Sequence, residues 1–370
     1  MKKIMTRLLS LVLLGAFIPG FVLADSWYLE DGDITVNATE TSQIVSQGGT
    51  SKPDSNPIIS TRAPGSSETG ATDNTVTITA EKNATANVTL ENVNIDVSSN
   101  LEAAITTQGQ GDVTLNLSGN NSVQSGEYHA GVHKENTGNL TVTAPEGGTG
   151  SLNATGGQGG AGIGGGYNGT GSDITISGGE VKATGGSYGA GIGGGYSGDG
   201  SDITVSGGEV KATGGVNGAG IGGGLQGKGK DITVSGDAKL KVQGGVESWT
   251  GGAGAGIGNG GSKADGNQIP GAEVEPDTSG LTTNGSIEYY APGADMDKDA
   301  PSQTIVGTYI PPQPAREAAA PAQPAAPLYR VTDGDGKDVS YETTWRDGVL
   351  TVTVEADRAV LTGRLSGIAS

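Results

Sequence analysis

Five aromatic residues flank the glycine-rich segments of this chain, at spacings that could bring their rings together: Tyr128, Tyr167, Tyr188, Tyr196 and Trp249. Tyr167 and Tyr196 each follow three consecutive glycines. Tyr128 and Tyr188 occupy equivalent positions before a Gly-Ala-Gly or similar segment. Aromatic rings are broad apolar surfaces with polar edges, against which the C–H face of a sugar can pack. The spacing predicts a glycan-binding platform. The alternative is that the rings only cover the backbone of turns.

Acidic residues recur at another position and indicate a second chemistry. Asp173, Asp202 and Asp231 follow one another at the same interval that separates the two tyrosines after the triple glycines. Asp199 places a further carboxylate near Asp202. Because Ca²⁺ takes six to eight oxygen ligands, a column of carboxylates could bind it. The alternative is an Asx turn, in which the side chain accepts a hydrogen bond from a nearby backbone N–H. We expect that no cofactor is required, with calcium as the one ion these residues could hold.

His129 and His133 are the only histidines of the chain. They could bind a metal, or one of them could act as a base, but no third ligand is evident. Asp333-Gly334-Asp335-Gly336 begins like a calcium loop, yet Thr344 stands at the twelfth position, where an EF-hand needs Glu. The sequence shows no catalytic residues, and we predict that the protein is not an enzyme.

An internal repeat defines the strands and turns that position these side chains. The segment Ala-Gly-Ile-Gly-Gly-Gly occupies residues 161–166, 190–195 and 219–224, and a variant at 255–260 follows an expansion of seven residues. Short segments between the copies alternate apolar and polar residues, which is the period of a β-strand. Glycine-rich pieces separate them, as turns with positive φ require. A fixed period of this size, built from short strands, indicates a solenoid.

The predicted fold is all-β, a parallel β-helix (β-solenoid) with coils of about 29 residues. Equivalent residues of successive coils should stack about 4.8 Å apart. This arrangement predicts internal ladders, of which the clearest contains Ile163, Ile192, Ile221 and Ile257. One coil cannot bury its own apolar face, whereas a stack forms a continuous core. Weaker copies upstream extend the repeat, so we expect seven or eight coils between about residues 31 and 290.

Changes in composition divide the rest of the chain. Residues 1–24 have the positive start, short apolar run and small terminal residues of a Sec-type signal peptide, which predicts an extracellular or cell-surface protein. No later run is long and apolar enough for a transmembrane segment. We expect the solenoid over 25–290, with its most regular coils at 151–261. An irregular cap (291–310), a Pro/Ala-rich linker (311–328) and a small, incomplete C-terminal β-rich module (329–370) should follow.

The charge of the chain limits the classes of partner that it can bind. The net charge is −19, and removal of residues 1–24 would make it −22. This acidity disfavours nucleic acid as a partner, because binding phosphates needs a basic surface. There is no cysteine, so an exported chain of this kind is stabilised without disulfides. We expect a monomer, with a polysaccharide or host glycan as the partner.

The Gly-Ala-Gly-Ile-Gly-Gly-Gly and Asp-Ile-Thr-Val-Ser-Gly-Gly patterns resemble those of glycine-rich β-helix surface proteins of gut Firmicutes. The resemblance covers nearly all of residues 31–370, and residues 329–363 look like the C-terminal piece of those proteins, which there runs on further. The architecture is more loosely similar to clostridial β-helix domains that bind carbohydrate with calcium. These resemblances imply a bacterial surface protein and carbohydrate binding, and they supply no catalytic residue.

Three functions are compatible with this pattern. The leading hypothesis is a non-enzymatic, secreted or cell-surface protein that binds glycans as an adhesin. The alternative is a structural spacer, or stalk, that displays a downstream module. A polysaccharide lyase or hydrolase is the third hypothesis. Such an enzyme needs clustered Asp, Arg or Lys on one face, and residues 151–261 contain no arginine.

Overall fold

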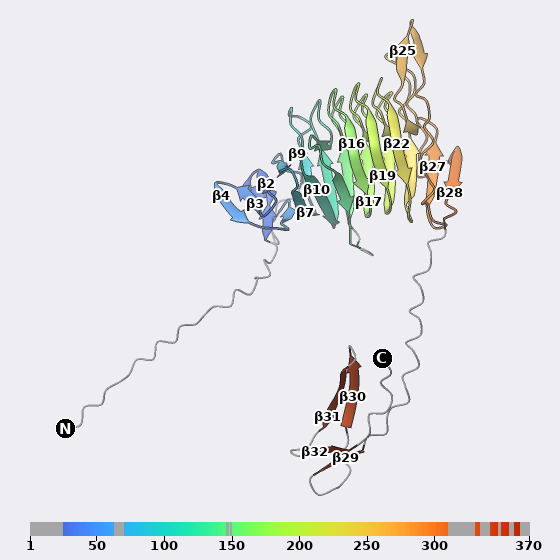
Figure 1. The fold of residues 1–370 in the computed structure, drawn as a ribbon. Coiled ribbons are helices and arrows are strands. Elements are labelled where there is room, and N and C mark those ends of the chain that lie inside the picture. The colour runs from blue at the N-terminus through green and yellow to red at the C-terminus, as the bar shows by residue number, and fades with distance from the viewer. Residues whose placement is uncertain are drawn as a thin grey trace, which may run out of the picture. The chain divides into compact units, whose positions relative to one another are not determined.

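The computed structural model describes residues 25–62, 70–145, 148 and 150–309, together with four strands between residues 330 and 362. The chain divides into two compact units, residues 1–310 and 311–370. The predicted signal peptide and Pro/Ala-rich linker lie outside the described residues. The predicted fold is confirmed, because the first unit is a parallel β-solenoid whose coils have the length of the sequence repeat (Figure 1).

Three sheets run along the solenoid, and each coil in its middle gives one strand to each sheet. Sheet 1 contains β1 (Ser26–Tyr28), β5 (Ile58–Ser60), β7 (Thr85–Glu91), β10 (Asp112–Ser118), β13 (Leu140–Thr143), β16 (Gly171–Ile176), β19 (Gly200–Val205) and β22 (Gly229–Val234). Sheet 2 contains β2 (Ile34–Ala38), β6 (Val76–Ala80), β9 (Ile105–Gly109), β12 (Val132–Lys134), β15 (Ile163–Gly164), β18 (Ile192–Gly193), β21 (Ile221–Gly222) and β24 (Ile257–Gly258). Sheet 3 contains β8 (Asn94–Asp96), β11 (Asn120–Gln124), β14 (Ser151–Thr155), β17 (Glu180–Thr184), β20 (Glu209–Thr213), β23 (Lys239–Gln243) and β27 (Ser286–Tyr290).

The core consists of the predicted ladders. Ile163 pairs with Ile192, Ile192 with Ile221, and Ile221 with Ile257, and all four side chains are buried. The ladder continues upstream through Val132 and Ile105. Fully burying one such side chain stabilises the fold by about 1.5–3 kcal/mol. Since every coil contributes several inward-facing aliphatic side chains, neighbouring coils hold each other together.

Antiparallel strands cover parts of both ends of the stack. At the N-terminal end β3 (Gln43–Gln47) and β4 (Thr50–Pro53) extend sheet 2 in antiparallel fashion, and Lys52 and Pro53 occupy the outer strand. Lysine and proline on an edge strand discourage pairing with other chains. At the C-terminal end β28 (Gln303–Val306) pairs antiparallel with β27.

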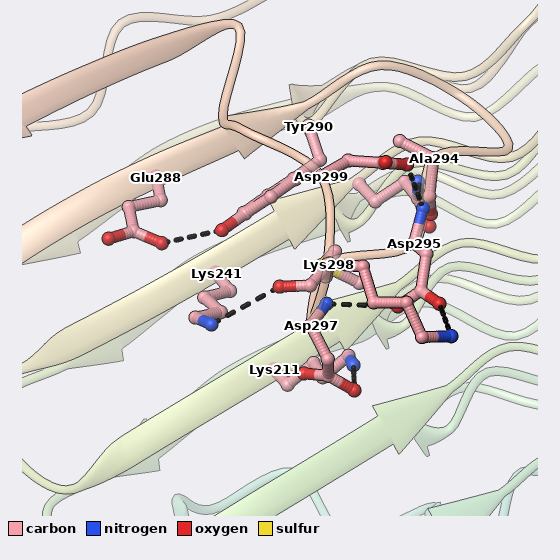
Figure 2. Close-up of polar contacts among 11 residues, drawn as sticks. Lys211, Lys241, Glu288, Tyr290, Ala294, Asp295, Asp297, Lys298 and Asp299 are labelled. Atoms are coloured by element: carbon pink, nitrogen blue, oxygen red, sulfur yellow. Dashed lines mark hydrogen bonds and ion pairs between the residues drawn. The ribbon is translucent and has the colours of Figure 1, made fainter.

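A loop between β27 and β28 crosses the outer face of sheet 3 (Figure 2). Lys211 Nζ lies 2.8 Å from Asp297 Oδ2, and Lys241 Nζ donates to the carbonyl oxygen of Met296 at 3.2 Å. Hydrogen bonding and attraction to the Lys211 ammonium lower the pKa of the Asp297 carboxyl. Lys182, Lys211 and Lys241 pair in register along sheet 3, and the loop therefore covers the last two of these three lysines.

Two elements complete the described structure. A hairpin of β25 (Ser262–Ala264) and β26 (Asn267–Ile269) projects beyond the coils (Figure 1). In the second unit β29 (Arg330–Asp333) pairs antiparallel with β32 (Ala359–Thr362), and β30 (Tyr341–Arg346) with β31 (Val349–Val354). The one helical element in the described part of the chain is the 3-10 turn η1 (Leu29–Asp31). No helix among these residues has the length and apolar character needed to cross a membrane.

Candidate functional site

One rim of the solenoid carries a column of turn residues just before sheet 2: Tyr128, Gly159, Tyr188 and Asn217. Backbone hydrogen bonds of 2.8–3.0 Å tie each of these turns to the turn of the next coil. All four residues have positive φ, between 64° and 85°. This conformation suits glycine or asparagine, but for a bulky side chain such as Tyr128 or Tyr188 it costs about 1–3 kcal/mol. The turn therefore holds two tyrosines in a conformation that their own side chains disfavour.

A second column follows the triple glycines on the same rim and brings four tyrosine rings together. The rings of Tyr167 and Tyr196 stack with centroids 4.8 Å apart and an angle of 3° between their planes. Tyr128 meets Tyr167 edge to face at 5.4 Å, and Tyr188 meets Tyr196 in the same manner at 5.8 Å. We call these four residues the tyrosine rim. Aromatic pairs in these arrangements contribute about 0.5–1.5 kcal/mol beyond the area they bury.

Gly159 makes room for this cluster. A Cβ atom at Gly159 would lie 2.8 Å from Cδ2 of Tyr167. The coil between Tyr128 and Tyr188 therefore presents no side chain at this position, and the Tyr167 ring lies over it. The sequence spacing predicted both columns but not this alternation of tyrosine and glycine.

The exposure of the rings limits how a sugar could contact them. Tyr128 and Tyr167 are 48% and 46% exposed, whereas Tyr188 and Tyr196 are half-buried. The stacked pair covers one face of each ring, so the accessible surface consists of outer faces, edges and hydroxyl groups. Trp249 is 77% exposed, and none of the ring contacts of the described residues joins it to the tyrosines. Four of the five predicted aromatic residues thus lie together in one cluster.

A groove of about 600 Å³ adjoins the rim. Its lining includes the aromatic and charged side chains of Tyr128, His129, His133, Lys134, Glu135 and Tyr167. The groove arises because the coil with β12 departs from the repeat. His133 pairs in register with Gly164 of the next coil, so side chains project where the later coils have only glycine. The sequence singled out the two histidines but did not connect them with the tyrosines.

The two imidazoles share a hydrogen bond. His129 Nδ1 and His133 Nδ1 are 3.0 Å apart, and His133 Nε2 lies 3.3 Å from Glu135 Oε1. We assign the His133 proton to Nε2, facing Glu135, so that its Nδ1 accepts from His129. Burial, and next the charge of His129, lower the pKa of His133 to about 4. His133 is therefore neutral at physiological pH.

The lowered pKa of His133 predicts that the stability of the fold depends on pH. The folded protein binds a proton at His133 near pH 4, whereas the unfolded chain does so near 6.5. The contribution of neutral His133 is therefore complete above pH 6.5 and is lost as the pH falls toward 4, by at most about 3 kcal/mol. In His133→Asn, the fall in unfolding free energy between these pH values should be much smaller, as urea titrations at each pH would measure. An unchanged slope would contradict this assignment.

Lys134 is buried beside the histidines and ties the irregular turn together. Its Nζ donates to the carbonyl oxygens of Asn136 and Gly138 at 2.7 and 2.8 Å. Burial lowers the pKa of this ammonium, while the carboxylates of Asp173 and Asp112 act in the opposite direction. Through these contacts Lys134 stabilises the wall of the groove.

Of the four predicted calcium candidates, Asp173, Asp202 and Asp231 lie in strands of sheet 1 and Asp199 directly precedes β19, and Asp173 also lines the groove. Asp173 and Asp202 have φ of 55° and 54° and are left out of the pairing between β16 and β19. Asp199 Oδ1 accepts a hydrogen bond from the backbone N–H of Lys228 at 2.7 Å, a contact between turns of adjacent coils. Asp231 Oδ2 lies 3.5 Å from Lys230 Nζ. No group of three or more His, Asp or Glu side chains within the described ranges is arranged to hold a metal ion.

The match to a known protein family concerns the fold of the repeat. The family model for the beta helix repeat matches residues 174–196 and 203–225, which are two successive coils. Searches of curated proteins and of solved structures gave no significant match. Together with the three parallel sheets, the repeat match shows that the fold of this chain is a parallel β-helix.

Proposed function

We propose that this protein is a non-enzymatic carbohydrate-binding protein that acts as an adhesin outside the cell. The observation that carries the proposal is the tyrosine rim, where Tyr128 and Tyr188 are held at positive φ and the four rings contact one another. Strained residues that persist in a structure often have a functional role. The export signal predicted from residues 1–24 supports a location at the cell surface or beyond.

The groove beside the rim supplies the polar groups that a sugar would need. His129 is only partly buried, and Glu135 has a half-exposed carboxylate, so both can exchange hydrogen bonds with hydroxyl groups. A site with a few polar groups next to aromatic side chains is the usual composition of a small-ligand pocket. Calcium stays a candidate ion at Asp199 and Asp202, and the proposal does not require it.

Loss of the Tyr167 ring is expected to weaken glycan binding by about tenfold, the effect of about 1.4 kcal/mol. The experiment screens the mature chain on a glycan array, with and without a calcium chelator, and measures affinities for the bound glycans by calorimetry. Tyr167→Ala and Tyr196→Ala should both lose affinity. Tyr309→Ala is the matched control, because Tyr309 is 42% exposed and lies outside the rim. Binding to no glycan, or equal affinity in all three variants, would refute the proposal.

A structural spacer is the second candidate function. The division of the chain into two compact units, residues 1–310 with the solenoid and residues 311–370, supports it, because a rod can hold another module away from a surface. If the glycan array shows no binding, this function becomes the better account of the solenoid.

A further inference from the structure

The most exposed large apolar side chain of the described residues is Trp249, at 77%. It lies in the seven-residue expansion of the repeat, and Lys263 of the projecting hairpin β25–β26 contacts its backbone. Single exposed apolar residues are common and need no explanation. The support beneath this one is unusual, because polar contacts hold its turn from two sides.

The first support is Asn217, a residue that the sequence did not single out. Its side chain is fully buried, and its Oδ1 accepts hydrogen bonds from the hydroxyl groups of Ser248 and Thr250, at 2.6 and 2.8 Å. Its Nδ2 donates to the carbonyl oxygens of Gly251 and Gly252, both at 2.7 Å. The residues on either side of Trp249 are therefore bound to one buried amide. The sequence signal for this role is that asparagine, at position 217, stands where the preceding coil has Tyr188.

The second support comes from the hairpin. Lys263 Nζ donates to the carbonyl oxygen of Trp249 at 2.9 Å, and Gln268 Nε2 donates to that of Ser248 at 2.7 Å. These bonds fix the backbone of the turn and leave the indole ring outside. A ring presented on a fixed turn loses little conformational freedom when it binds a ligand, so it contributes more to affinity than a mobile one.

Trp249 also lies on the rim that carries the tyrosines. The column of Tyr128, Gly159, Tyr188 and Asn217 continues to Glu247, since Asn217 N–H donates to the carbonyl oxygen of Val246 at 3.0 Å. Trp249 follows two residues later. From Tyr128 to Glu247 the column crosses four coil spacings, or roughly 19 Å at strand separation. Aromatic groups therefore lie at both ends of a strip that runs along the solenoid axis.

The charges around the strip favour a neutral ligand. Residues 128–261, which contain the strip, carry a net charge of only −3. The charged side chains closest to Trp249 in the turn and in the hairpin strand that contacts it are of both signs, Glu247 and Lys263. A polyanion would find no excess of positive charge here, and an anionic membrane would be repelled by the acidic chain as a whole.

We infer that Trp249 is a second contact for the ligand of the tyrosine rim, and that this ligand is an extended neutral polysaccharide lying along the solenoid axis. The inference rests on the proposed function and specifies its ligand. Two contacts on one chain act together, because the second binds at the high effective concentration that the first creates. A short oligosaccharide reaches one contact only.

Chain length is the variable that tests this inference. The probes are oligosaccharides of two to eight sugars from β-1,4-linked glucan, xylan and mannan, with oligogalacturonates of the same lengths as the anionic series. Wild-type affinity should rise by at least about tenfold once the oligosaccharide spans both contacts. Trp249→Ala should abolish the rise without changing affinity for the shortest ligands that bind. Leu101→Ala, at a residue that is 67% exposed, is the control and should keep the rise.

Asn217→Ala tests the positioning role of the amide. It should reduce the rise in affinity with chain length while increasing hydrogen exchange in residues 246–252, a readout that Trp249→Ala should leave nearly unchanged. A rise that persists in Trp249→Ala, or no rise in the wild type, would overturn the inference and leave the proposed function intact. Binding confined to oligogalacturonates would overturn the neutral class of ligand. Binding to nothing, or full affinity in Tyr167→Ala, would remove the proposed function and the inference together.

Discussion

Gly193→Ala is expected to destabilise the solenoid by about 2–6 kcal/mol, the sum of backbone strain and steric overlap, each about 1–3 kcal/mol. Gly193 has φ of 132°, and a Cβ atom there would lie 2.1 Å from the carbonyl oxygen of Gly222 in the next coil. The contact is with backbone, which cannot move without disturbing the coil above it. Gly164 and Gly222 occupy the same column with the same restriction. The turn can therefore form only where the side chain is a hydrogen atom.

Gly32→Ala is the matched control for this prediction. Gly32 has φ of 118°, but no atom lies within 4 Å of the position its Cβ would take. It should show the strain alone, about 1–3 kcal/mol. Urea denaturation followed by circular dichroism would measure both variants against the wild type. Equal losses in the two variants would mean that the overlap between coils contributes nothing, contrary to the packing described.

The repeat made the core predictable, because a constant period places equivalent residues in register. Ile163 and Ile192 pair as the spacing of the repeat requires. Their environment is the same in each coil, so the pattern of one coil describes the next. The tyrosine columns followed from the same periodicity. What the spacing could not supply was the direction of each ring, which depends on the positive φ of Tyr128 and Tyr188 and on the missing side chain at Gly159.

The rest of the candidate site lies where the repeat fails. His133 and Lys134 replace glycines of the later coils, and a period carries no information about what such replacements contact. Imidazole packing depends on Gly166 of the next coil, where a Cβ would lie 2.5 Å from Cε1 of His133. Asn217 contacts the residues on either side of Trp249 because the repeat is expanded there. These contacts are non-local, and they become visible only once the coils are stacked.

Ile192→Ala should lower the unfolding free energy by about 2–5 kcal/mol, the usual result of truncating a fully buried isoleucine. Its position adds a second effect. Each coil of a solenoid contacts only its neighbours, so stability is close to a sum of coil and interface terms. Ile192 lies between Ile163 and Ile221, and a cavity there weakens the interfaces on both sides. The coils on the N-terminal and C-terminal sides should then unfold at different urea concentrations.

Ile257→Ala is the control for position, because Ile257 is equally buried but belongs to β24, the last strand of its sheet at the C-terminal end. The cavity is similar, yet only one neighbouring coil, that of Ile221, loses its partner. Hydrogen exchange at increasing urea would follow β6–β13 and β19–β23 separately. In Ile257→Ala the opening should begin at the C-terminal coils, whereas in Ile192→Ala it should divide the stack at the middle. A single transition over all coils in both variants would show that coupling extends well beyond neighbouring coils, so that the tyrosine rim and the Trp249 turn would be stabilised as one unit.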